Sequence, residues 1–250
     1  MADAGPGSGS ADRPAFYALS PGGWRDYWTL LHPPYTLWHL SYVAFGTAAA
    51  ERFDARRLWA TLLAFGLAIG LSAHALDELN GRPLRTRIPS AVLWAIAAAG
   101  LAGALGIGVL GVVRATPWLL AYMAVGAFVL VAYNLELLGG RFHSDAWFAA
   151  AWGAFPALTA AFAQDEAVRP PHLLVAAACL ALSLAQRRLS TPVRTLRRKT
   201  RSVHGVQVLE DGTELRLDAP ALRAPLESAL RAISVAMPLL AAGLLWLRFG

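Results

Sequence analysis

The residues best suited to chemistry lie in one stretch, SAHALDELNGRPLRTRIPS, which follows a long apolar run. His74, Asp77 and Glu78 are three and four positions apart, so on a helix their side chains share one face. Carboxylates are disfavoured in the last turn of a helix, so a positive group should compensate them. That group is either one of the arginines that follow or a divalent cation. Alternatively, the arginines contact only lipid phosphates and set the topology of the chain. The candidate site residues of this stretch are His74, Asp77, Glu78, Asn80, Arg85 and Arg87.

The composition is that of a membrane protein. The chain of 250 residues is 56% hydrophobic and only 15% charged, whereas ordinary soluble domains are about 25% charged. Apolar runs of about 18 residues can cross the hydrocarbon core as helices, and the alternating segments of a membrane barrel are absent. We therefore expect an all-α polytopic membrane bundle. Its spans, about seven in number, are expected at 35–50, 58–76, 89–112, 117–138, 146–164, 171–186 and 227–247.

The segments outside these spans set the expected domains and orientation. Residues 1–23 are rich in Gly and Pro and lack the features of a signal peptide, so a disordered tail is expected there. A bundle of about six spans follows at 24–186, then a basic loop at 187–226 and a last span within 227–250. Most of the 22 Lys and Arg lie in the N-terminal segment and in the loops after the even-numbered spans. These parts, including the N-terminus, should therefore face the cytoplasm from the inner membrane.

Two further polar segments are expected at the same cytoplasmic face. His143, together with His74 and the carboxylates, raises the idea of a transition-metal site, although the spacing matches no known ligand pattern. The arginines after the sixth span bind either anionic lipid headgroups or a substrate phosphate. Nucleic acid is not an expected partner, because no recognition fold accompanies the basic residues. The candidate residues of the two segments are Tyr133, Glu136, Arg141 and His143, and Arg187, Arg188 and Arg194.

The expected cytoplasmic loop contains a β-hairpin signal, VQVLEDGTELRL. Val206 and Val208 alternate with polar residues on one arm, Leu215 and Leu217 do so on the other, and an Asp-Gly pair occupies the turn. A two-stranded hairpin is marginally stable alone, so it should lie against the bundle or a partner. Both a lid over the polar face and a dimer contact remain open.

The stretch 72–90 resembles the first aspartate-rich motif of the UbiA-type intramembrane prenyltransferases. That motif ends in D-G-x-x-x-R-T, which matches Asn80 through Thr86 and places Asp77 at the preceding aspartate and His74 at an earlier one. The entry segment HPPYTLWHLSYVAFGTAAA is similar to the first helix of the family. The chain departs from the family in having fewer spans and no second aspartate motif, since QRRLSTPVRTLRRKTR contains no carboxylate.

The resemblance implies transfer of a prenyl group from a prenyl or polyprenyl (di)phosphate at the cytoplasmic face. It implies Mg²⁺ on Asp77 and Asn80, with Asp77, Glu78 and Tyr133 as catalytic residues. Substrate binding would involve His74, Asn80, Arg85, Arg87, Glu136, Arg141, His143, Arg187, Arg188 and Arg194. Two alternatives stay open: a degenerate relative that binds lipid or a partner protein without catalysis, and a metal-dependent membrane enzyme that uses His74 and His143.

Overall fold

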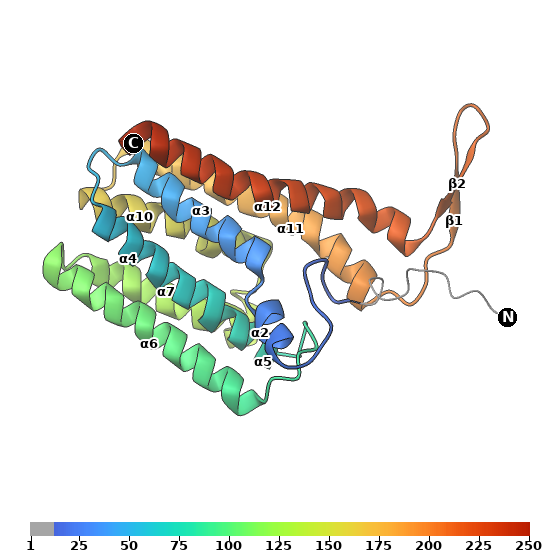
Figure 1. Ribbon diagram of the computed structural model, residues 1–250, viewed down its shortest axis with the longest axis horizontal. Helices are drawn as coiled ribbons and strands as arrows, with labels where there is room; N and C mark the ends of the chain where they lie inside the picture. The colour runs from blue at the N-terminus through green and yellow to red at the C-terminus, as the bar shows by residue number, and fades with distance from the viewer. Residues whose placement is uncertain (1–12) are drawn as a thin grey trace.

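Long apolar helices make up most of the chain in this computed structural model, which describes residues 13–250 (Figure 1). Two of the long helices are composite, because a π-helical segment joins two α-helical parts. They are α4–η1–α5 (Ala55–Phe65, Gly66–Ala73, His74–Leu79) and α9–η2–α10 (Asp145–Ala149, Ala150–Ala154, Phe155–Asp165). The others are α3 (Pro33–Ala49), α6 (Ser90–Arg114), α7 (Leu119–Asn134), α11 (Pro170–Arg198) and α12 (Ala219–Phe249), with short helices α2 (Trp24–Leu30) and α8 (Leu137–Gly140).

Five helices in the described chain are long and apolar enough to cross a membrane: Ala55–Leu79, Ser90–Arg114, Asp145–Asp165, Pro170–Arg198 and Ala219–Phe249. The expectation of about seven spans is therefore met only in part. α3 and α7 have 17 and 16 residues, which correspond to roughly 25 Å of helix against a hydrocarbon core of about 30 Å. α7 ends before the predicted residue 138, because Glu136 and Leu138 take positive φ angles of 51° and 56° and turn the chain away.

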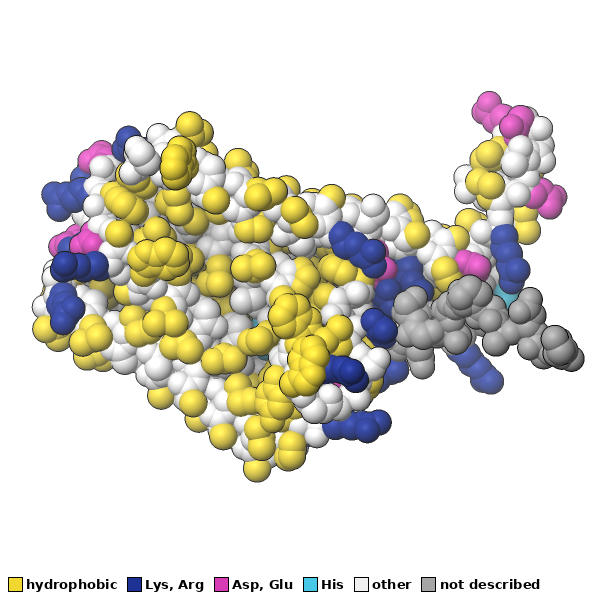
Figure 2. Space-filling view, in the orientation of Figure 1, with side chains coloured by type: hydrophobic (Ala, Val, Ile, Leu, Met, Phe, Trp, Pro, Cys, Tyr) yellow, Lys and Arg dark blue, Asp and Glu magenta, His cyan; other side chains and the backbone are white. Residues whose placement is uncertain are grey.

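The outer surface supports an integral membrane protein. Hydrophobic side chains cover most of the face shown in Figure 2, and charged side chains gather near the two ends. On α6, Val113 is 78% exposed, and on α12 Trp246 and Leu247 are 77% and 83% exposed. Apolar area exposed on this scale would be unfavourable in water but is expected against lipid.

Glycines allow two close helix contacts inside the bundle. A Cβ added at Gly46 on α3 would lie 2.0 Å from the carbonyl oxygen of Ala157 on α10. A Cβ at Gly153 on η2 would lie 2.6 Å from the carbonyl oxygen of Cys179 on α11. Small residues let helix backbones approach in this way, and membrane helices commonly pack through them. α3 lies between α10 and α12 and makes its most extensive contacts with these two helices.

The predicted disordered tail is corrected for its second half. Residues 1–12 lie outside the described residues, but residues 13–19 pack on the bundle. Ala18 is 1% exposed, and the ring of Phe16 meets that of Tyr35 edge to face at 6.1 Å. The guanidinium of Arg198 donates a hydrogen bond to the carbonyl of Pro14 at 3.1 Å. The sequence does not predict these aromatic and backbone contacts, because the short segment lies among Gly and Pro residues that are typical of disorder.

The predicted loop 187–226 is shorter in the structure, and it contains the predicted hairpin. α11 continues to Arg198, because Ser190 and Val193 on its inner face remain buried. α12 begins at Ala219, where the Asp218 side chain caps the helix by accepting a hydrogen bond from a backbone N–H. Between them β1 (Gly205–Val208) and β2 (Glu214–Leu217) form an antiparallel pair. The hairpin is exposed and projects away from the bundle, so it does not cover the helix ends (Figure 1).

Candidate functional site

Asp77 lies at the end of α5, where it faces arginines of α11. Its side chain is within electrostatic range of Arg194 and Arg198, and also of Glu78 and His143. Over residues 13–250, the carboxylate makes neither a hydrogen bond nor an ion pair with another side chain. A partly buried carboxylate without a direct partner is unusual, because desolvated charges normally pair. The positive charge opposite Asp77 therefore acts across a gap rather than through contact.

Tyrosines from three other segments approach the same place. Tyr133, at the end of α7, is within electrostatic range of Asp77 and Arg194. Tyr35, in the first turn of α3, is near Arg194 and Arg198, and Tyr17 in the N-terminal segment is near both arginines and Asp77. Segments far apart in sequence thus converge at one end of the bundle. We refer to Tyr17, Tyr35, Asp77, Tyr133, His143, Arg194 and Arg198 as the Asp77 cluster.

A pair of stacked histidines lies beside this cluster. The rings of His32 and His74 are 4.2 Å apart and nearly parallel. Burial lowers the pKa of His32 well below its ordinary value, and the nearby His74 and Arg198 lower it further. Burial also raises the pKa of Tyr17 well above its ordinary value. Tyr17 therefore keeps its proton, and its hydroxyl forms a hydrogen bond with Nδ1 of His32 at 2.7 Å, while the buried Nε2 of His32 has no hydrogen-bond partner among the described residues.

His143 is held against Tyr133. Their rings stack at 4.5 Å, and Nδ1 of His143 donates a hydrogen bond to the carbonyl of Tyr133 at 3.0 Å. The carboxylate of Glu136 lies 3.9 Å from the same nitrogen but is exposed. The sequence predicted that His143 and Tyr133 belong to one polar segment, and the structure brings both to the edge of the Asp77 cluster.

Glu78, predicted as a catalytic residue, has a structural contact instead. Its side chain is fully buried and accepts hydrogen bonds from the backbone N–H of Leu84 at 2.9 Å and of Thr86 at 2.8 Å. The Thr86 hydroxyl donates a third bond at 2.8 Å. These bonds close the loop that follows α5. Adjacent residues on a helix point about 100° apart, so Glu78 faces this loop while Asp77 faces α11.

The loop after α5 directs several predicted residues away from the cluster. Arg82 and Arg85 take left-handed φ angles of 54° and 57°, and the Arg82 guanidinium donates to the carbonyls of Thr86 and Ile88. The loop therefore turns back on itself and its other arginines point outward. Asn80 is also exposed, and its amide donates to the carbonyl of Asn134 at 3.3 Å. The predicted residues found exposed are Asn80, Arg85, Arg87, Glu136, Arg141 and Arg188.

Arg187 is close to the cluster but already paired. Its Nε donates to the Asp145 carboxylate at 2.8 Å, and its guanidinium lies over the Phe148 ring at 5.0 Å.

The sequence did not identify four residues in or beside the cluster: Arg198, Tyr17, Tyr35 and His32. The spacing of four between Arg194 and Arg198 would have placed both on one helix face, had the basic segment been read as helix.

The donor atoms present do not fit a dimetal Mg²⁺ site. No group of three or more His, Cys, Asp or Glu side chains within residues 13–250 could hold a metal ion. Asp77 is the one carboxylate of the cluster, and Asn80 is exposed and turned toward α7. Mg²⁺ prefers several oxygen ligands in octahedral geometry. Arginines suit the recognition of a phosphate directly, because their planar donors bind two oxygens at once.

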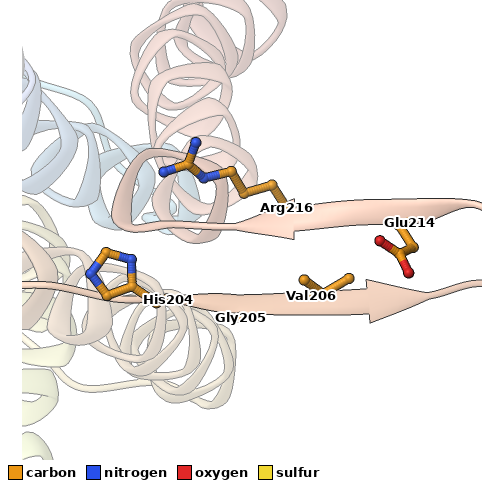
Figure 3. A pocket seen from close by; sticks show the side chains of 5 residues that line it. All are labelled: His204, Gly205, Val206, Glu214 and Arg216. Atoms are coloured by element: carbon orange, nitrogen blue, oxygen red, sulfur yellow. The ribbon is translucent and has the colours of Figure 1, made fainter.

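Two hollows of the described surface lie away from the Asp77 cluster. One of about 570 Å³ runs along the hairpin between residues of both strands (Figure 3). Its lining belongs to an exposed two-stranded ribbon, so nothing rigid shapes it. A second, of about 240 Å³, lies between the N-terminal segment and the ends of α11 and α12. The first is lined by His204, Gly205, Val206, Glu214 and Arg216.

The fold and the Asp77 cluster define a helical membrane protein with a polar cluster that contains two arginines at one end of its bundle. No family model, curated protein or solved structure matches the chain. The assignment of function therefore depends on the chemistry of the cluster.

Proposed function

We propose that the protein is a UbiA-like intramembrane transferase that acts on a prenyl or polyprenyl (di)phosphate. The observation that carries the proposal is the approach of Arg194 and Arg198 to Asp77, whose carboxylate has no direct partner among the described residues. A phosphate placed between the two helices would meet both guanidinium groups. The apolar surfaces of the bundle would accommodate the isoprenoid chain. We propose that the end of the bundle that carries the Asp77 cluster faces the cytoplasm, as the distribution of Lys and Arg predicts.

The proposed chemistry starts with heterolysis of the allylic C–O bond. The bonding electrons leave with the diphosphate, which Arg194 and Arg198 stabilise through charge-assisted hydrogen bonds. The rings of Tyr35 and Tyr133 would stabilise the allylic cation, as aromatic rings do for other cations. The acceptor then forms a bond with that carbon, and Asp77 takes the proton that the acceptor loses. Mg²⁺ bound to the diphosphate would supply further charge neutralisation, and Asp77 is the one carboxylate of the cluster that could contact it before it acts as the base.

The test is product formation by the purified protein in lipid nanodiscs. Tritiated geranylgeranyl diphosphate is supplied with Mg²⁺ and a bacterial lipid extract as the source of acceptor, and labelled apolar product is separated by chromatography. We expect product with the parent protein and a loss of about 100-fold or more with Asp77→Asn, because removal of a general base typically costs 10²–10⁴-fold. Arg194→Gln with Arg198→Gln should also abolish product. The exposed Arg188→Gln is the matched control and should keep full activity. An Asp77→Asn protein that folds and keeps full activity would refute the proposal.

A second candidate is binding of an isoprenoid phosphate without catalysis. It is favoured by the single carboxylate of the cluster, since the family's usual metal clamp uses two motifs. In that case geranylgeranyl diphosphate should raise the melting temperature of the parent, with an effect that depends on Arg194 and Arg198, and no labelled product should form. The third sequence-based alternative, a metal enzyme using His74 and His143, has less support, because these side chains stack on different partners.

A further inference from the structure

A hollow of about 240 Å³ lies where the N-terminal segment crosses the end of α11 and the start of α12. From α11 it is lined by Arg197, whereas Arg194 and Arg198 approach the Asp77 cluster. Its described lining is basic, with one carboxylate and four guanidinium groups among residues 13–250. The side chains that matter are those of Arg13, Phe16, Arg197, Arg223, Glu227 and Arg231.

The one carboxylate of this hollow is already neutralised. Glu227 is 6% exposed and receives two hydrogen bonds from the Arg197 guanidinium, one of them at 2.9 Å. Arg231 reaches the same carboxylate only at 3.9 Å. Arg13 and Arg223 have no carboxylate within ion-pair distance in the described chain. Within the part of the chain that the structure describes, three guanidinium groups thus remain around the hollow without a matching carboxylate.

Contacts with the surrounding structure hold Arg197 and Arg231 in position. Arg223 and Arg231 are eight residues apart on α12, so they share one face with Glu227 midway between them. The Arg231 guanidinium lies over the Phe16 ring at 5.2 Å. Arg197 donates to the carbonyl of Arg13 at 2.9 Å and so fixes the N-terminal segment beside the hollow. Such an arrangement reduces the entropy lost when an anion binds.

The hollow is at the level expected for lipid headgroups. α12 has 31 residues, or about 46 Å of helix, which exceeds the roughly 30 Å of the hydrocarbon core. The apolar C-terminal part of α12 therefore occupies the membrane, while its first turns extend beyond it. In Figure 1 the start of α12 and the end of α11 run together past the other helices, and in Figure 2 arginine and lysine side chains gather at this end.

We infer that this hollow is a binding site for a phosphate group, separate from the Asp77 cluster and independent of the function proposed for it. Arg13, Arg223 and Arg231 would supply the donors, and the Arg197–Glu227 pair would form its wall. The phosphate is presented either by an anionic lipid or by a free phosphate compound. The position of the hollow beside the membrane makes both sources accessible.

The test uses the full-length protein in phosphatidylcholine nanodiscs, with phosphatidic acid added in increasing proportion or inorganic phosphate added to the solution. The readout is the melting temperature, supported by native mass spectrometry for bound lipid. The site variant is Arg223→Gln with Arg231→Gln. The matched control is Arg201→Gln with Arg216→Gln, which removes the same charge from exposed positions outside the hollow. A third variant, Arg223→Lys with Arg231→Lys, keeps the charge but loses the bidentate donors.

We expect the site variant to lose at least about tenfold in affinity for phosphatidic acid, which corresponds to about 1.4 kcal/mol. The lysine variant should fall between it and the parent, and this variant decides the outcome if the glutamine variant does not fold. The control should bind like the parent. Stabilisation by inorganic phosphate alone, lost in the site variant, would identify a soluble phosphate as the ligand. Equal losses in site variant and control, or binding of neither probe by the parent, would overturn the inference.

Discussion

Neutralisation of two adjacent carboxylates, Asp77 and Glu78, should have very different effects on stability. Glu78→Gln keeps the size of the side chain but replaces one acceptor oxygen with an NH₂ group. The remaining oxygen can still accept from Thr86, and the NH₂ group then faces the backbone N–H of Leu84, which donates at 2.9 Å in the parent. That N–H is left buried and unpaired. Asp77→Asn removes no hydrogen bond to a described residue.

The contacts set the size of the difference. An unsatisfied buried donor costs about 1–3 kcal/mol, and the bonds that remain lose the strength contributed by a charged acceptor. We therefore expect Glu78→Gln to lower the free energy of unfolding by about 2–4 kcal/mol. For a chain of this length, that corresponds to a fall in melting temperature of roughly 5–15 °C. Asp77→Asn should change the stability by less than about 1 kcal/mol in either direction.

The assay is thermal unfolding of both variants in the same detergent, followed by intrinsic tryptophan fluorescence. Proteolysis of the loop after α5 gives an independent readout, because only Glu78→Gln should release this loop. The reasoning would be refuted by a Glu78→Gln protein as stable as the parent, or by an Asp77→Asn protein that loses as much stability as Glu78→Gln.

Two further predictions concern packing and pH. Gly46→Ala should destabilise the fold by more than about 3 kcal/mol, because the added Cβ would meet a backbone carbonyl of α10. Gly106→Ala on α6 adds its Cβ in open space, so this variant should be neutral or slightly stabilising. The yield and the melting temperature of the two variants test this prediction. His32 has a lowered pKa in the folded protein, so below about pH 6.5 the unfolded chain binds a proton that the folded chain does not, and stability should fall as the pH falls. His32→Gln should flatten the dependence of melting temperature on pH between 6.5 and 5, and an unchanged slope would contradict this assignment.

The helical architecture and the hairpin could be predicted from the sequence because their signals are local. Apolar runs mark the long helices, and the Asp-Gly turn between alternating arms marks β1 and β2. The ends of the elements were less predictable. The basic composition of residues 187–198 suggested a loop, yet Ser190 and Val193 face inward and continue α11. Charge describes the outer face of such a helix, and burial of the inner face decides where it ends.

The candidate site was predictable only in part, for a geometric reason. Asp77, Tyr133, His143 and Arg194 were all identified from polar residues at the ends of apolar runs, and they do converge. Arg85 was expected to compensate Asp77 because it is close in sequence. It points to solvent instead, because the intervening loop reverses direction through residues with positive φ. Sequence distance is a poor guide across a loop whose turns depend on a buried carboxylate.

The roles of Glu78 and Asp77 depend on each other through that loop. Glu78 and Arg82 fold the loop back, which carries its outer arginines away from the end of the bundle. As a result, the positive charge opposite Asp77 comes from α11, more than a hundred positions along the chain. The end of α11 is in turn held by the N-terminal segment, since Arg197 and Arg198 both donate to its carbonyls. A change that loosens residues 13–18 should therefore disturb the two arginine-rich sites together, whereas a change at Asp77 should affect only one of them.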